Sequence, residues 1–153
     1  MRKDELLEII EEFDTTAELK KFFEDNCKQL ALKPLNSNMI KDTNKEFITT
    51  NDTILAKDIR GVNNPNYHNK TPLDIINSAE NMDNALKAII NNPEFLLEDY
   101  SKTKLSLTLI KDEDGNNQYF LNSTGNHRVV ILLALSDVCE ELKIEDVEVV
   151  EYE

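Results

Sequence analysis

The periodicity of the apolar residues changes at residue 105, and no other feature restricts the fold as strongly. In residues 4–30 and 71–91 the apolar side chains recur at the three- and four-residue spacing of amphipathic helices. From residue 105 to 109 they alternate with polar residues, Asp114-Gly115 then provides a turn, and residues 119–121 return the chain as a second strand. Helices in one part of the chain and a β-hairpin in another predict an α+β fold.

The first thirty residues predict a helical hairpin. A first amphipathic helix is followed by Thr15 and Glu18, which form the capping-box pattern that opens a second helix through about Leu30. We expect residues 1–33 to form this hairpin and to pack on a domain formed by residues 45–153.

Short strands and helices follow one another in the rest of the chain. Residues 34–53 are rich in Asn, Thr and Lys, which predicts a loop with one short strand near residue 47, and a further strand is expected over residues 54–61. Thr71 and Pro72 are typical of a helix cap and a first helical turn. The other expected elements are helices over residues 71–76, 79–91 and 129–142, the last of them buried, and a final strand over residues 146–152.

The charge is strongly negative and lies mainly at the two ends. The chain has 30 acidic and 17 basic residues, a net charge of −13 and a pI near 4.6. Residues 1–25 hold nine acids and four bases, and residues 137–153 hold eight acids and one base, so the middle of the chain is nearly neutral. This balance disfavours direct binding to DNA or to anionic lipid. The acidic ends are either solvated surfaces or a surface for a basic protein partner.

Several other classes of protein are disfavoured by composition. No apolar run approaches the roughly 18 residues of a membrane-spanning helix, and no signal peptide is recognisable, so we expect a cytoplasmic protein without membrane contact. Cys27 and Cys139 are far apart, which argues against a disulfide framework. His68 and His127 are the only histidines, so we do not expect a zinc site.

The segment between the hairpin and the buried helix contains the strongest candidates for ligand-binding side chains. It is the run of residues 123–128, Ser-Thr-Gly-Asn-His-Arg, and its Gly125 is one of only three glycines. The start of a helix offers free N–H groups and the positive end of the helix dipole, which together bind anions. Arg128 could clamp a phosphate through two hydrogen bonds, His127 could donate another, and a hydroxyl of Ser123 or Thr124 could add a contact.

The same residues also fit a purely structural role. Thr124 or Asn126 could cap the helix, His127 could be half-buried, and Arg128 could pair with a surface acid. Spacing alone favours neither interpretation.

A resemblance favours the phosphate site. The hairpin, then Gly125-Asn126-His127-Arg128, then an aliphatic helix and a last strand, resembles the ParB/sulfiredoxin superfamily, whose signature is Gly-x-His-Arg or Gly-x-Arg-Arg. The resemblance covers about residues 54–152. Thr124 stands where the family often has an aspartate. Asn126 stands where the sulfinic acid reductases have cysteine, so their thiol chemistry is not expected here.

The resemblance implies a small mixed sheet with packed helices that binds a nucleoside triphosphate, with Mg²⁺, through the 123–128 turn. It also implies a phosphotransferase or nucleotide hydrolase activity in which Asp58 and His127 are catalytic. Asp58 belongs to the Asp58-Ile59-Arg60-Gly61 run, which is similar to a step in some small ParB-like proteins. Further candidate ligand-binding residues are Lys57, Arg60 and His68.

Two alternatives remain open at this point. One is a noncatalytic acidic interaction protein, of phage or mobile-element type, which docks on a basic or nucleic-acid-binding protein. The other is a ParB-like nuclease, which the charge of −13 disfavours because no basic track is present to hold a phosphate backbone.

Overall fold

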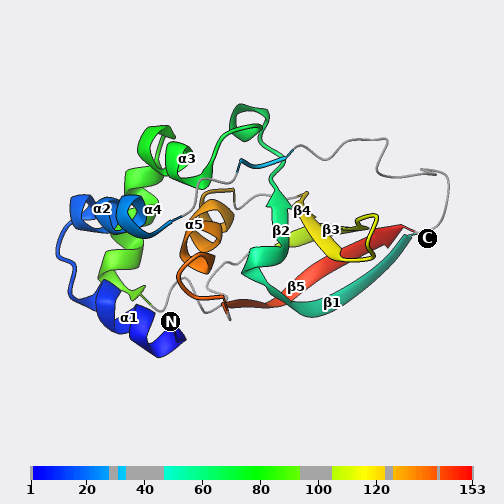
Figure 1. Cartoon of the computed structure of the whole chain (residues 1–153), viewed down its shortest axis with the longest axis horizontal. Helices are drawn as coiled ribbons and strands as arrows, with labels where there is room; N and C mark the ends of the chain where they lie inside the picture. The colour runs from blue at the N-terminus through cyan, green and yellow to red at the C-terminus, as the bar shows by residue number, and fades with distance from the viewer. Residues whose placement is uncertain are drawn as a thin grey trace.

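A computed structural model describes residues 2–27, 31–33, 47–93, 105–122, 126–140 and 142–152. The fold is α+β, as predicted. Over these residues the chain forms five α-helices, two short 3₁₀ turns and one five-stranded mixed sheet. Figure 1 shows α1–α4 grouped on one side of the molecule, the sheet on the other, and α5 between them.

The helices begin where capping residues stand in the sequence. The Thr15 hydroxyl accepts a hydrogen bond from the Glu18 amide at 3.3 Å and donates to the Glu18 carboxylate at 3.1 Å, which confirms the predicted cap. The Thr71 hydroxyl accepts from the Asp74 amide at 3.1 Å in the same way. The helices are α1 (Lys3–Glu11), α2 (Thr16–Asn26), α3 (Pro72–Ser78), α4 (Met82–Asn91) and α5 (Asn126–Ser136).

The sheet has the strand order β1-β5-β3-β4-β2. Its strands are β1 (Phe47–Leu55), β2 (Ile59–Gly61), β3 (Ser106–Lys111), β4 (Asn117–Leu121) and β5 (Lys143–Tyr152). Strands β3 and β4 form the predicted antiparallel hairpin, whose turn contains Gly115 at φ 84°. Strand β2 pairs with β4 in parallel, β5 pairs with β3 in parallel, and β1 pairs with β5 antiparallel.

Some element boundaries differ from the sequence prediction. Strand β1 continues through residues 49–53, which were predicted as loop. The side chains of these residues are exposed, and their backbone pairing with β5 makes them part of an edge strand. The strand predicted over residues 54–61 is interrupted by the 3₁₀ turn η2 (Ala56–Asp58). Helix α5 ends at Ser136 rather than at residue 142. The Ser136 hydroxyl donates to the Leu133 carbonyl oxygen at 2.6 Å, and turns follow.

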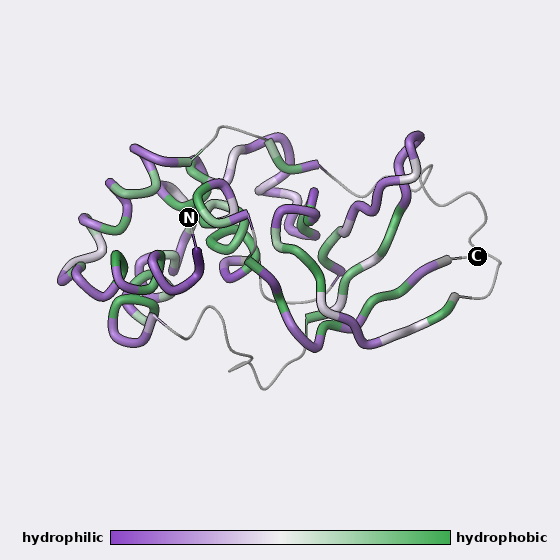
Figure 2. Tube along the Cα trace, turned by 60° about the horizontal axis from the view of Figure 1, so that its bottom comes forward, coloured by the Kyte–Doolittle hydropathy of each residue, from purple (hydrophilic) through white to green (hydrophobic). Residues whose placement is uncertain are grey.

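The buried apolar residues form one continuous core. Leu6 and Ile10 of α1, and Leu19 and Phe23 of α2, belong to the same cluster as the buried face of α5 and the sheet. The ring of Phe13, in the turn after α1, lies 5.8 Å from the ring of Phe22 in α2. Figure 2 shows hydrophobic and hydrophilic positions interleaved along these helices, as expected where only one side of a helix is buried.

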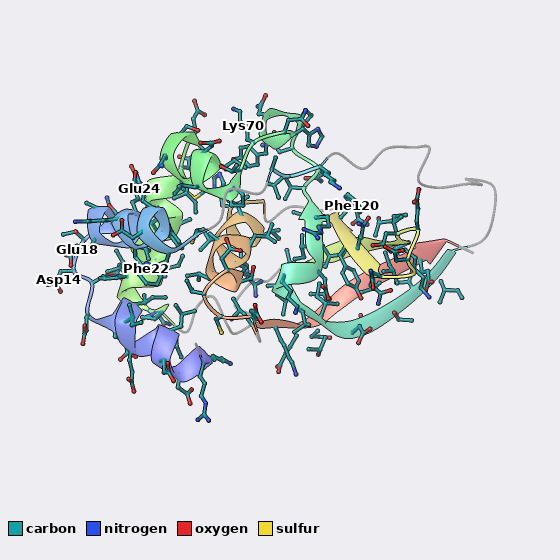
Figure 3. The ribbon with its side chains drawn as sticks, in the orientation of Figure 1. Asp14, Glu18, Phe22, Glu24, Lys70 and Phe120 are labelled. Carbon is teal, nitrogen blue, oxygen red and sulfur yellow. The ribbon has the colours of Figure 1, made fainter. Side chains whose placement is uncertain are left out.

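Residues 31–33 cross the outside of β2, and Gly61 makes this crossing possible. The Lys33 amide donates to the Arg60 carbonyl oxygen at 2.9 Å, and the Leu32 amide donates to the Lys70 carbonyl oxygen at 2.8 Å. A Cβ atom on Gly61 would collide with the Lys33 carbonyl oxygen and would lie 2.8 Å from Cδ1 of Phe120. Phe120 is labelled beside β2 in Figure 3. A glycine is therefore required here for space rather than for an unusual φ angle.

Candidate functional site

The parallel pairing of β2 and β4 determines which loops meet. Ile59 is opposite Tyr119, and Gly61 is opposite Phe120. Because the carboxyl ends of parallel strands lie at the same edge of a sheet, the segment after β2 comes to the edge from which the chain enters α5. Such edges are where open α/β sheets bind ligands.

Tyr67 and His127 join these two segments. The Tyr67 hydroxyl is hydrogen-bonded to Nε2 of His127 at 3.0 Å, and the two rings are stacked with centroids 6.3 Å apart and an interplanar angle of 30°. The residues are sixty positions apart in the sequence. This contact holds the segment after β2 against the first turn of α5.

The loop that carries Tyr67 is built to hold it in place. The Asn64 side chain accepts from the Asn66 amide at 3.0 Å and caps the 3₁₀ turn η3 (Pro65–Tyr67), with Pro65 in its first turn. Nε2 of His68 donates to the Val62 carbonyl oxygen at 2.9 Å. His68, a candidate ligand-binding residue, therefore uses one ring nitrogen to close this loop.

The Tyr67 phenol remains protonated near neutral pH. Burial, and then the negative charge of Glu80, raise the pKa of Tyr67 above its ordinary value. The phenol can therefore donate to Nε2 of a neutral His127, which then carries its proton on Nδ1, or it can accept from Nε2 of the imidazolium. The contact fits either protonation state of the histidine and fixes the plane of its ring.

His127 and Arg128 occupy the first turn of α5, directly after Asn126, and both side chains are half-buried. The Nε atom of Arg128 is withdrawn from solvent. The backbone of Asn126 opens the helix. Ser123, Thr124 and Gly125, which complete the predicted phosphate turn, lie outside the described residues.

A cavity of about 390 Å³ adjoins Tyr67. Its lining is mostly polar and includes Asn64, Asn66, Tyr67, Lys70, Ser78 and Glu80. Lys70 is exposed and follows η3 in the chain (Figure 3). Tyr67 and Lys70 were not among the candidate residues from the sequence, because only the pairing of β2 with β4 brings their loop to α5. The Pro65-Asn66-Tyr67 run, an aromatic residue in a polar loop after a proline, was the available signal.

The other candidate residues lie elsewhere. Asp58 precedes β2, whereas His127 follows β4, so the parallel pairing places them at opposite ends of the strand pair. After burial, the charges of Asp52 and Asp58 raise the pKa of Tyr119, the residue of β4 that is paired with Ile59. Lys57 and Arg60 line a second cavity of about 250 Å³. The structure thus brings His127, the neighbour of Arg128 in the first turn of α5, together with the Tyr67 loop, but not with Asp58.

Comparison with protein-family models, with curated proteins and with solved structures finds no match to this chain. Within the described residues, no group of three or more His, Cys, Asp or Glu side chains could hold a metal ion. No helix in the same part of the chain is long and apolar enough to cross a membrane.

Proposed function

We propose that this chain binds a nucleotide, or another small phosphate-bearing molecule, where α5 begins. The observation that carries the proposal is the 3.0 Å hydrogen bond between Tyr67 and His127, which fixes a histidine in the first turn of a helix at the carboxyl edge of β2 and β4. The positive end of the helix dipole favours an anion at this point. Arg128 on the same turn supplies a fixed positive charge.

The cavity beside Tyr67 gives the rest of the ligand a place to lie. Tyr67 both lines that cavity and contacts His127, so a ligand whose phosphate lies at α5 can extend along the phenol ring. Asn64, Asn66 and Ser78 offer hydrogen bonds to a sugar or a base, and Lys70 offers a second positive charge. The resemblance of the Gly125–Arg128 run to the ParB/sulfiredoxin superfamily supports the same ligand class.

Mg²⁺ belongs to this proposal as part of the ligand. Mg²⁺ usually keeps several waters and binds through substrate phosphates with only one or two carboxylates, so a protein-built cage is not required. Glu80 is the carboxylate that lines the cavity beside Tyr67. We therefore expect a nucleoside triphosphate to arrive as its Mg²⁺ complex. Phosphotransfer or hydrolysis is the activity to be assayed once binding is established.

Thermal unfolding with ATP, CTP, GTP, ADP and inorganic phosphate, each with and without Mg²⁺, tests the proposal. A ligand present at one hundred times its Kd stabilises the folded state by about 2.7 kcal/mol, which raises the Tm of a domain of this size by roughly 5–10 °C. Arg128→Ala and Tyr67→Phe should each reduce the increase. Lys111→Ala, which removes an exposed charge on the β3–β4 hairpin, should leave the increase unchanged.

Because Arg128 is half-buried, its replacement can also destabilise the fold. Calorimetric titration of Arg128→Lys separates the two effects, since lysine keeps the charge but cannot form the paired hydrogen bonds of a guanidinium. If none of these ligands stabilises the unmodified protein, the proposal fails, and docking on a basic protein partner becomes the better explanation of the acidic composition.

A further inference from the structure

The cavity of about 250 Å³ lies near the other end of α5 and is not part of the site proposed above. The carboxyl end of the helix faces η2, the turn between β1 and β2 (Figure 1). Both elements contribute to the cavity, together with β2 and the turn that follows α5. We call it the α5 carboxyl-end cavity. The nucleotide proposal does not use any of its residues.

Charges of opposite sign enter this cavity from different elements. Lys57 comes from η2 and Arg60 from β2, whereas Asp137 and Glu140 come from the turn after α5. Among the described residues no salt bridge joins Lys57 or Arg60 to an acid, whereas Lys20 and Asp83 form an ion pair at 2.8 Å on the helical side of the molecule. The two cations therefore remain available to a ligand.

Apolar side chains line this cavity together with the two sets of charges. Ile59, which is buried, and Leu133, which is half-buried, line the same cavity. A volume of about 250 Å³ is slightly below the range of about 300–1,000 Å³ that is typical of pockets for drug-sized ligands. The cavity therefore suits a small molecule that carries both apolar and charged groups.

The charge pattern restricts the ligand further. A simple anion would meet Asp137, Glu140 and the negative end of the α5 dipole, and a simple cation would meet Lys57 and Arg60. A nucleotide carries several negative charges and is disfavoured by the same two acids. Only a ligand with one charge of each sign gains from both walls.

We infer that the α5 carboxyl-end cavity binds a small zwitterion of the ω-aminocarboxylate class. Its carboxylate lies against Arg60 and Lys57, because a guanidinium pairs with a carboxylate through two parallel hydrogen bonds. Its ammonium group lies against Asp137, Glu140 and the carboxyl end of α5. Its methylene chain lies against Leu133, the half-buried apolar side chain of the lining.

Calorimetric titration with three zwitterions of different length, 4-aminobutanoate, 6-aminohexanoate and 8-aminooctanoate, tests this inference. We expect at least one to bind with a Kd of about 1 mM or tighter. Hexanoate and hexylammonium, which each keep one charge and the apolar chain, should bind at least about tenfold more weakly than 6-aminohexanoate or the best zwitterion. Binding should weaken as NaCl is raised, because three of the four charged side chains are exposed.

Variants test whether the zwitterion binds in the α5 carboxyl-end cavity. Arg60→Gln and Glu140→Gln remove one exposed charge from each wall and should each weaken binding at least about fivefold. Lys111→Gln and Glu113→Gln, on the β3–β4 hairpin and outside the cavity lining, are matched controls and should bind as the unmodified protein does. Arg128→Ala separates this site from the nucleotide site and should also leave zwitterion binding unchanged, provided that its circular dichroism spectrum is native.

The inference is overturned if none of the three zwitterions binds. It is equally overturned if hexanoate or hexylammonium binds as tightly, or if Arg60→Gln and Glu140→Gln bind with unaltered affinity. These results do not depend on nucleotide binding, so either proposal can fail without the other.

Discussion

The close contact at Gly61 makes Gly61→Ala the sharpest test of the fold around the candidate site. A Cβ atom there would collide with the carbonyl oxygen of Lys33 and lie 2.8 Å from Cδ1 of Phe120. Phe120 is only 1% exposed, so its ring has little room to move away. Residues 31–33 can yield only by giving up backbone hydrogen bonds to Arg60 and Lys70.

These contacts set the expected magnitude. Overpacking a buried site costs about 1–3 kcal/mol, and each lost backbone hydrogen bond costs about 1 kcal/mol. We therefore expect Gly61→Ala to lower the free energy of unfolding by roughly 3 kcal/mol, measured by urea denaturation, and to lower the Tm on the order of 6–12 °C. Hydrogen exchange at the amides of Leu32 and Lys33 should accelerate, because both amides bond across this crossing.

Gly115 provides the matched control. It has φ 84°, and nothing lies within 4 Å of a Cβ atom built on it, so its requirement is conformational rather than spatial. Asparagine adopts left-handed backbone angles more readily than other residues, and Gly115→Asn should cost less than about 1 kcal/mol. If Gly61→Ala destabilises the protein no more than Gly115→Asn does, the crossing of residues 31–33 over β2 is wrong.

Four further predictions concern Thr15, Tyr67 and Cys27. Thr15→Ala should lower the free energy of unfolding by about 1 kcal/mol, since it removes the hydroxyl that caps α2, and Thr15→Ser should restore most of the loss in the same urea measurement. Tyr67→Phe should cost about 1 kcal/mol for the lost hydrogen bond to His127, whereas an unchanged stability would contradict that contact. Burial, and then the charge of Asp137, raise the pKa of Cys27 from 9.0 to about 12, so this thiol should react with iodoacetamide at pH 8 far more slowly in the folded protein than in urea. Because the folded pKa is the higher one, the stability contributed by the Cys27 thiol is complete below pH 9 and is lost as the pH rises from 9 towards 12, which denaturation at a series of pH values can detect.

Local signals in the sequence were sufficient to predict most of the helices and the β3–β4 hairpin. The caps at Thr15 and Thr71 and the turn at Gly115 act over a few residues, so a pattern read along the chain captures them. Strand β1 was largely missed because its exposed polar residues carry no alternation, and only its partner β5 makes it a strand. The end of α5 was missed because apolar composition continues beyond Ser136 while the hydrogen bonding changes.

For the same reason, the candidate site could be predicted only in part from the sequence. His127 and Arg128 could be selected from their motif, since a glycine before a helix is a local signal. The contact of Tyr67 with His127 depends on the parallel pairing of β2 with β4, which no local sequence pattern predicts. Asp58 was grouped with His127 by resemblance alone, and the direction of β2 separates the two.

The position of β5 in the sheet has a kinetic consequence. It lies between β1 and β3, so Phe47 pairs with Tyr152 and Ser106 pairs with Glu148 across long stretches of chain. Contacts between residues so distant in sequence slow the search for the native topology. During synthesis, β1 must wait for residues 143–152 to leave the ribosome before it acquires a neighbour, whereas the β3–β4 hairpin can close much earlier.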